Sequence, residues 1–265
     1  MLLENKNAVI YGGSGAIGGA VARVFAREGA RVFLAGRTQS TLDAVAADIA
    51  AAGGRAETAR VDVFDQQAVE QHANAVAAKA GSIDIALNAV SIMHDQGTRL
   101  EALSLEEFMR PIDGCLRTLF ITSKALARHM GGKRPGVILT LSEPGSKMAA
   151  AGILGHSVSG AGREAFSRVL AAELAPRNIR VVCIRPHAIS DAPAAGSYTK
   201  ALFAPMATAE GVSFQEFMAG MAQGTLLKRL PTLSEVAETI AFLASDRAGA
   251  MTGTVANLSC GALVD

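Results

Sequence analysis

Short apolar runs alternate with longer amphipathic segments along the whole chain, and this alternation limits the fold more than any other feature. The apolar runs end in glycine, proline or polar residues and are typical of buried strands. The longer segments repeat apolar residues at helical spacing, as Ile17 and Val21 do. The predicted strands are Asn7–Tyr11, Arg31–Ala35, Ala59–Val63, Ile83–Asn88, Gly136–Leu141, Arg180–Ile184 and Gly253–Leu258. The predicted helices are Ile17–Glu28, Ser40–Ala52, Gln66–Ala80, Leu105–Met130 with a break near Pro111, His156–Ala175 and Ser234–Ala244.

Strands that are apolar on both faces and joined by helical crossovers indicate a parallel sheet covered by helices on both sides. We therefore expect one doubly wound α/β domain over residues 1–265, with no linker and no repeat. Only residues 190–225 lack a strand, and we expect this segment to act as a substrate lid. Phe214, Phe217 and Met221 recur there at helical spacing, which predicts a lid helix and a partly apolar substrate, although core packing explains the spacing as well.

The charge balance excludes several classes of protein. There are 25 Lys and Arg residues against 24 Asp and Glu, with no basic block, which argues against partners such as nucleic acid or an anionic membrane. No apolar run approaches the length of a membrane span, and we expect no signal peptide. The three cysteines, Cys115, Cys183 and Cys260, are far apart, so we expect reduced thiols and a cytoplasmic protein.

A glycine-rich loop joins the first predicted strand to the first predicted helix. Gly13, Gly15 and Gly18 fit the pattern G-x-G-x-x-G in that context. Backbone N–H groups at such a helix start can bind a pyrophosphate, and glycines let the backbone approach it closely. The loop therefore predicts a dinucleotide site, the alternative being a tight turn without a ligand.

The residues after the second predicted strand indicate which dinucleotide is preferred. An NAD site places a carboxylate there for the ribose 2′-hydroxyl, whereas this chain has Gly36 followed by Arg37. A guanidinium suits a 2′-phosphate, so we expect NADP(H) in preference to NAD(H). The alternative is an ordinary surface arginine.

Several motifs together resemble the short-chain dehydrogenase/reductase family over nearly the whole chain. Tyr11–Gly18 is similar to its TGxxxGxG loop, with Tyr in place of Thr and Ala16 in place of the middle Gly. Val61-Asp62-Val63 resembles the stretch whose Asp holds the adenine, and Asn88 keeps the first residue of the NNAG motif. Two further stretches carry the likeness, Ile184–Ile189 beside the nicotinamide and Gly224–Gly253 near the C-terminus.

This resemblance implies a Rossmann-type domain, a small-molecule substrate, and a homodimer or homotetramer formed through helices Leu105–Met130 and His156–Ala175. It also implies a set of cofactor-binding positions. These are Gly12, Ser14, Ala16, Ile17, Gly18, Arg37, Thr38, Asp62, Val63, Asn88, Ala89, Pro186, His187 and Ile189.

The catalytic positions depart from the family pattern. Family members use a Tyr-x-x-x-Lys pair with a Ser and an Asn: the Tyr donates the proton, the Lys lowers its pKa and binds the ribose, and the Ser polarises the carbonyl. The matching positions here hold His156, Gly160, Glu143 and, near the Asn, Cys115. Ser142 is one residue early and would point to the other side of its strand. Asp191 replaces a Thr near the cofactor phosphates, which would repel it.

Three functional interpretations follow from these departures. The first is an NADP(H)-linked oxidoreductase acting on an unknown carbonyl or alcohol, with His156 as proton donor and Glu143 as its partner. The second is a catalytically silent dinucleotide-binding sensor or scaffold. The third is a non-redox, lyase-like enzyme using Glu143 and His156. His94 and His187 are also metal-compatible, but they come from separate loops, and we predict no metal site.

Local alternatives stay open for each residue. Glu143 could form a surface ion pair with Lys147, His156 could cap its helix, and His187 could bond a backbone carbonyl.

Overall fold

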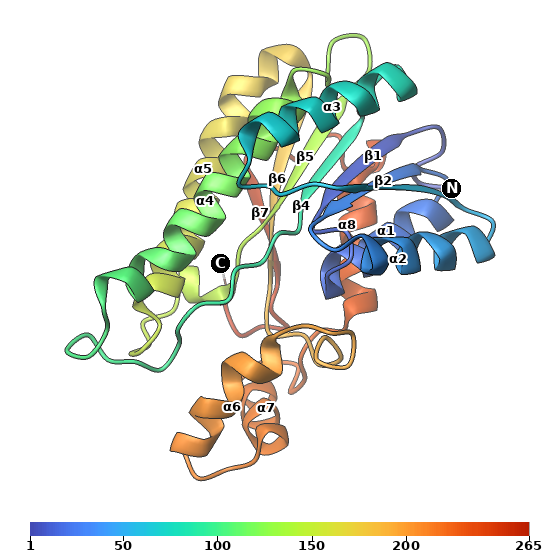
Figure 1. Cartoon of the computed structure of the whole chain (residues 1–265). Coiled ribbons are helices and arrows are strands. Elements are labelled where there is room, and N and C mark those ends of the chain that lie inside the picture. Colours follow the sequence, from blue (N-terminus) through green and yellow to red (C-terminus); the bar gives the residue numbers. More distant parts are fainter. Residues whose placement is uncertain (265) are drawn as a thin grey trace.

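Seven parallel strands form one sheet in the order β3-β2-β1-β4-β5-β6-β7 in the computed structural model, which describes residues 1–264 (Figure 1). The strands are β1 (Asn7–Tyr11), β2 (Arg31–Gly36), β3 (Arg55–Arg60), β4 (Ile85–Asn88), β5 (Gly136–Leu141), β6 (Ile179–Pro186) and β7 (Thr254–Leu258). The order reverses direction between β1 and β4, which is where ligands bind in doubly wound sheets. The fold class predicted from the sequence is confirmed.

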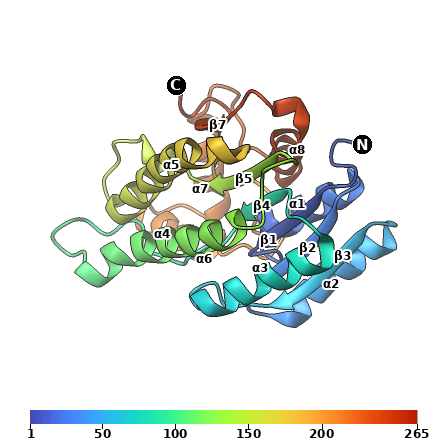
Figure 2. The ribbon, with the colours of Figure 1, turned by 90° about the horizontal axis from the view of Figure 1, so that it is seen from above.

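Helices cover both faces of the sheet (Figure 2). The helices α1 (Ala16–Arg27), α2 (Gln39–Ala51) and α8 (Leu233–Ala244) lie on one face. The other face carries α3 (Gln66–Ala80), α4 (Leu105–Ala127) and α5 (Leu154–Leu174). Two buried apolar clusters fill the layers between the sheet and each set of helices. Within residues 1–264, we find no helix that combines the length and apolar character needed to cross a membrane.

Residues 190–225 leave the layered body and contain two short helices, α6 (Thr199–Ala209) and α7 (Phe214–Gln223). They pack together below the sheet in Figure 1, and the Phe203 and Phe217 rings lie 5.8 Å apart between them. The helical spacing near Phe214 predicts α7 correctly, whereas α6 has no counterpart among the predicted elements.

The third strand lies elsewhere than the sequence predicts. The apolar pattern predicts Ala59–Val63, whereas β3 covers Arg55–Arg60. It is an edge strand that pairs only with β2, and its residues are half-buried or exposed, so it lacks the apolar signature of a central strand. The buried Val61 and Val63 follow its end.

The predicted break in the fourth helix is also wrong, because α4 continues through Pro111. A proline inside a helix costs about 3 kcal/mol, and here tertiary packing offsets that cost. Pro111 is buried, and its carbonyl accepts a hydrogen bond from the Ser159 Oγ of α5 at 2.9 Å. A capping box of Ser104 and Glu107 starts the helix.

Candidate active site

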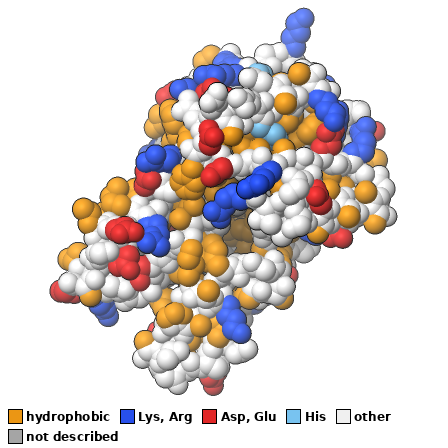
Figure 3. All heavy atoms as spheres, viewed as in Figure 1, with side chains coloured by type: hydrophobic (Ala, Val, Ile, Leu, Met, Phe, Trp, Pro, Cys, Tyr) orange, Lys and Arg blue, Asp and Glu red, His pale blue; other side chains and the backbone are white. Residues whose placement is uncertain are grey.

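A cavity of about 560 Å³ opens at the carboxyl ends of the strands and extends towards α6 and α7. Figure 3 shows the corresponding hollow, with hydrophobic side chains around its rim. The glycine loop lines one side of it through Gly15, Ala16 and Ile17, and Glu143 and His156 line another. The glycine loop and the candidate catalytic residues Glu143 and His156 therefore share one cavity.

Two positions of the glycine loop have no room for a side chain. Gly12 has a φ of +76°, and a Cβ there would lie 2.6 Å from the Ala89 carbonyl oxygen. A Cβ on Gly18 would lie 2.1 Å from the Gly12 carbonyl oxygen. No side chain caps the start of α1, so its first backbone N–H groups remain available to an anion. Ser14, in the same loop, accepts a hydrogen bond from Thr41 Oγ1 at 2.9 Å.

The predicted adenine-side residues lie at the ends of neighbouring strands. Arg37 follows β2, is exposed and pairs with no carboxylate among residues 1–264, while Thr38 is the N-cap residue of α2. The backbone N–H of Phe64 donates to the exposed Asp62 carboxylate at 3.0 Å. The structure therefore leaves the Arg37 cation free to meet an anion.

Asn88 is fixed at the end of β4. Its Nδ2 donates to Thr122 Oγ1 of α4 at 2.8 Å, and its Oδ1 accepts from the Val90 N–H at 3.1 Å. The backbone N–H of Ala89 donates to the Tyr11 carbonyl, which ties the β4 end to the glycine loop.

Across the cavity lie Pro186, His187 and Ile189, which end or follow β6. Burial lowers the pKa of His187, whose Nδ1 accepts from the Ala188 N–H at 2.6 Å rather than bonding a carbonyl. Asp191 Oδ1 accepts from the Leu233 N–H at the start of α8 at 2.8 Å. This bond gives that carboxylate a structural partner outside the glycine loop.

Glu143 and His156 meet. Glu143 follows β5 and His156 lies in the first turn of α5, and Nε2 of the ring is 2.8 Å from Oε2 of the carboxylate. The contact is close but not aligned as a hydrogen bond, since Oε2 accepts none among the described residues, and it is an ion pair only when the imidazole is protonated. Oε1 accepts from the Arg163 Nη2 at 3.3 Å. Lys147 is exposed and does not take part, and His156 does not cap α5, so these two alternatives are wrong.

Two glycines make room for this pair. A Cβ on Gly160 would lie 1.8 Å from Glu143 Oε1. A Cβ on Gly145 would lie 2.6 Å from Glu143 Oε2 and 2.8 Å from the Cδ2 of His156. Side chains at either position would displace the carboxylate, so both glycines are required by the contact.

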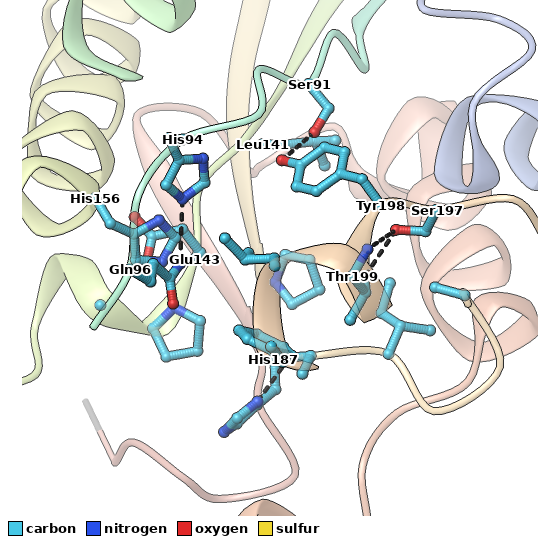
Figure 4. Close-up of a pocket in the computed structure, with 18 of the residues that line it drawn as sticks. Ser91, His94, Gln96, Leu141, Glu143, His156, His187, Ser197, Tyr198 and Thr199 are labelled. Atoms are coloured by element: carbon cyan, nitrogen blue, oxygen red, sulfur yellow. Dashed lines mark hydrogen bonds and ion pairs between the residues drawn. The ribbon is translucent and has the colours of Figure 1, made fainter. Parts of the chain in front are cut away.

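His94 joins the pair from the loop after β4. Its ring stacks on that of His156, with centroids 4.9 Å apart and planes inclined by 10° (Figure 4). Its Nδ1 lies 2.7 Å from the Ile92 carbonyl, and its Nε2 lies 3.1 Å from the Gln96 amide nitrogen. A neutral imidazole with the proton on Nδ1 satisfies both bonds. Burial lowers the pKa of His94 to about 4, which agrees with that neutral form.

Of the four metal-compatible residues, His94, Glu143 and His156 therefore converge, while His187 lies apart and points away from them in Figure 4. Among residues 1–264, no three His, Cys, Asp or Glu side chains are arranged to hold a metal ion. Cys115 lines the same cavity.

Ser142 lines the cavity and, contrary to the prediction from strand register, does not turn to the side opposite Glu143: its hydroxyl reaches the Gly160 carbonyl of α5 and a buried network. The carboxylate of Glu164 on α5 accepts from Ser142 at 2.8 Å, Ser146 at 2.6 Å and the Arg185 Nε at 2.7 Å. Burial by itself would raise the pKa of Glu164, but these hydrogen bonds together lower it below its ordinary value.

Sequence reasoning missed four residues around the pair: Arg163, Tyr198, and Glu164 with its ion-pair partner Arg185. Arg163 follows His156 by seven residues, which is two helical turns, so helical spacing could have found it. Tyr198 lies at the start of α6, where its hydroxyl accepts from Ser91 Oγ at 2.6 Å (Figure 4). No local pattern indicates that long-range contact.

Comparisons with known proteins bear on the whole chain. Residues 13–262 match the family model described as enoyl-(acyl carrier protein) reductase. The 3-oxoacyl-(acyl-carrier-protein) reductase FabG of Chlamydia muridarum is 30% identical over 261 residues, which are 98% of this chain and 98% of that protein. An uncharacterized oxidoreductase of Mycobacterium tuberculosis is 32% identical over 253 residues, covering 95% of this chain and 89% of its own.

Solved structures show the same likeness. A dehydrogenase/reductase from Sinorhizobium meliloti superimposes with a TM-score of 0.82 at 27% identity, covering 99% of this chain and 96% of its own. A short chain dehydrogenase from Burkholderia cenocepacia, in complex with NADP, gives a TM-score of 0.80 at 26% identity and covers 99% of both chains.

Proposed function

The chain belongs to the short-chain dehydrogenase/reductase family, and on that premise we propose that it is an NADP(H)-dependent oxidoreductase in which His156 is the proton donor and Glu143 its partner. One observation carries the proposal: the Glu143–His156 pair and the glycine loop line the same cavity. The substrate is a carbonyl compound or, in the reverse direction, an alcohol.

The residues present fit a bound dinucleotide. The glycine loop leaves space for a pyrophosphate at the uncapped start of α1, and Arg37 offers a free cation to a 2′-phosphate. Asp62, Asn88 and Pro186 would line the remaining length of the molecule. Bound NADPH would supply a hydride to the carbonyl carbon of the substrate.

His156 performs the proton transfer. Its Nε2 faces Glu143, whereas its Nδ1 has no partner among the described residues and is available to a substrate oxygen. Protonated His156 donates the Nδ1 proton to that oxygen, and the Glu143 carboxylate stabilises the imidazolium beforehand. In the alcohol direction, neutral His156 accepts the proton instead.

The α6–α7 region acts as the substrate lid. Leu202, Phe203, Met206, Phe217 and Met221 face the cavity from it. These side chains favour a substrate with an apolar body next to its reacting carbonyl.

The experiment begins with a titration of the protein with NADPH, NADP⁺, NADH and NAD⁺, followed by NADPH consumption on a panel of carbonyl compounds. We expect tighter binding of NADPH than NADH, and turnover that His156→Phe reduces at least about a hundredfold. His129→Phe is the matched control, since His129 bonds Asn74 outside the cavity. Binding without turnover would favour the silent sensor, and turnover without any nucleotide would favour the lyase-like enzyme.

A homo-oligomer is the assembly we propose. Phe120 of α4 is 51% exposed and Val169 of α5 is 55% exposed, which leaves apolar area on both long helices. Phe120→Asp should lower the sedimenting mass towards that of a monomer, and the exposed-loop variant Val212→Asp should not. An unchanged mass in Phe120→Asp would contradict assembly through these helices.

A further inference from the structure

The fixed charges behind His156 cancel in pairs. Arg163 faces the carboxylate of Glu143, and Arg185 faces that of Glu164 with Nε at 2.7 Å and Nη2 at 3.0 Å. Glu164 and Arg185 are almost completely buried, so this second pair stays intact. Next to His156 the charges of Glu143 and Arg163 therefore oppose each other, and His156 is the member of this trio whose charge can change.

Arg163 is held firmly where it can neutralise Glu143. Its Nη1 donates to the Leu141 carbonyl at 2.9 Å, and its Nε lies 3.4 Å from the Ser159 carbonyl. Its side chain is only 15% exposed, so water screens its charge weakly. The guanidinium is thus fixed against Oε1 of the carboxylate, whereas the imidazole faces Oε2.

We propose that Arg163 is a positioning and charge-balancing residue whose guanidinium neutralises Glu143 and so keeps the His156 proton exchangeable; this rests on the proposed function. A buried carboxylate whose sole cationic partner is an imidazole holds the proton on that imidazole strongly. With Arg163 present, Glu143 is already compensated, and His156 can lose its proton to substrate and regain it. Arg163 acts through Glu143, and its guanidinium hydrogen bonds go to Glu143 and to backbone carbonyls.

The other groups around His156 do not supply this balance. His94 stacks on it but is neutral, because burial lowers its pKa to about 4. Tyr198, from the α6 end, is neutral because burial raises its pKa. Cys115 of α4 and His187 after β6 line the cavity with no hydrogen bond or ion pair to the His156 ring among the described residues, and Lys147 is exposed.

The test follows the imidazole resonances of the protein by NMR across pH, and identifies His156 as the signal lost in His156→Phe. Arg163→Met should raise the pH midpoint of that signal by about one unit, because the carboxylate then has the imidazole as its sole cationic partner. Glu143→Gln should lower the midpoint. Arg163→Lys should lie close to the unchanged protein because it keeps the charge.

Two further variants separate charge from structure. Arg163→Gln keeps a donor for the Leu141 carbonyl but removes the charge, so it should shift the midpoint as Arg163→Met does, even if the latter folds poorly. Arg168→Met removes an equal charge from an exposed position on the same helix and should leave the midpoint in place. An unchanged or lowered midpoint in both Arg163→Met and Arg163→Gln would overturn the proposal.

Activity gives a second, separate readout. Carbonyl reduction needs protonated His156, so its loss at high pH should move upward with the midpoint in Arg163→Met, while the maximal rate falls because the imidazolium is a weaker acid. A protein that shifts its NMR midpoint but shows no reductase activity would disprove the proposed function and leave the charge-balancing role intact.

Discussion

Oε1 of Glu143 occupies the space that any side chain at Gly160 would need: a Cβ there would lie 1.8 Å from it. The sequence resemblance aligns Gly160 with the family's lysine and Glu143 with its serine, and the steric contact couples these two departures. The Cδ of the same carboxylate would lie 2.8 Å from that Cβ, and the nearest atom of another residue, the Cβ of Ser146 at 3.1 Å, would need only a small shift.

Gly160→Ala tests this coupling because its effect on folding stability should be opposite to the usual effect of replacing glycine by alanine in a helix. Alanine in a helix interior is ordinarily more stable than glycine by up to about 1 kcal/mol. Here we expect a loss of about 1–3 kcal/mol and at least a tenfold loss of activity, because Glu143 must leave His156. In a Glu143→Ser background the same change should become neutral or stabilising. Urea unfolding of the four proteins measures the cycle, and additive effects would contradict the coupling.

The sequence predicts the sheet and most helices well because central strands and helices carry strong periodic signals. It fails at β3, where an edge strand such as Arg55–Arg60 alternates weakly, and at Pro111, where packing on α5 overrides a local helix breaker. The same distinction applies to the site. Glu143 and His156 are singled out because the sequence resemblance aligns them with residues of a known pattern, whereas the contacts of Arg163 and Tyr198 are set by tertiary structure.

Arg37→Glu should exchange the cofactor preference. The substitution removes the cation suited to a 2′-phosphate and introduces a carboxylate suited to a ribose hydroxyl. We expect NADPH affinity to fall at least about tenfold while NADH affinity holds or rises. Arg55→Glu, at the far end of β3 from this loop, is the control. Equal losses of affinity for NADPH and NADH would show that Arg37 does not distinguish a 2′-phosphate from a 2′-hydroxyl.

Stability should fall with acid through two buried imidazoles. Burial lowers the pKa of His94 to about 4, and that of His72, 3.0 Å from the Tyr11 hydroxyl, also to about 4. Unfolding restores values near 6.5, so the unfolded chain binds more protons between about pH 6.5 and 4. The stability that they contribute is therefore complete above about pH 6.5 and is lost as pH falls through that window.

His94→Gln isolates one of these contributions. The substituted chain should lose less unfolding free energy between pH 7 and pH 4.5 than the unchanged protein, and His72→Gln should do the same. Urea unfolding at a series of pH values measures the slope. A slope that neither substitution reduces would show that other groups cause the acid sensitivity.

Tyr198→Phe should loosen the α6–α7 region from the body of the protein. The Tyr198 hydroxyl accepts from Ser91 Oγ at 2.6 Å and donates to the Ile92 carbonyl at 3.3 Å, so one phenol ties the start of α6 to the loop after β4. Its loss costs about 1 kcal/mol, which corresponds to about fivefold faster hydrogen exchange in residues 199–223. Thr208→Val, which removes a hydroxyl bonded only to Ala204 within α6, should leave exchange at the start of α6 unchanged.

If the region closes over substrate, KM should rise in Tyr198→Phe more than kcat falls, because open conformers bind substrate poorly. Exchange as slow in Tyr198→Phe as in the unchanged protein would mean that apolar packing, and not this phenol, holds α6 in place.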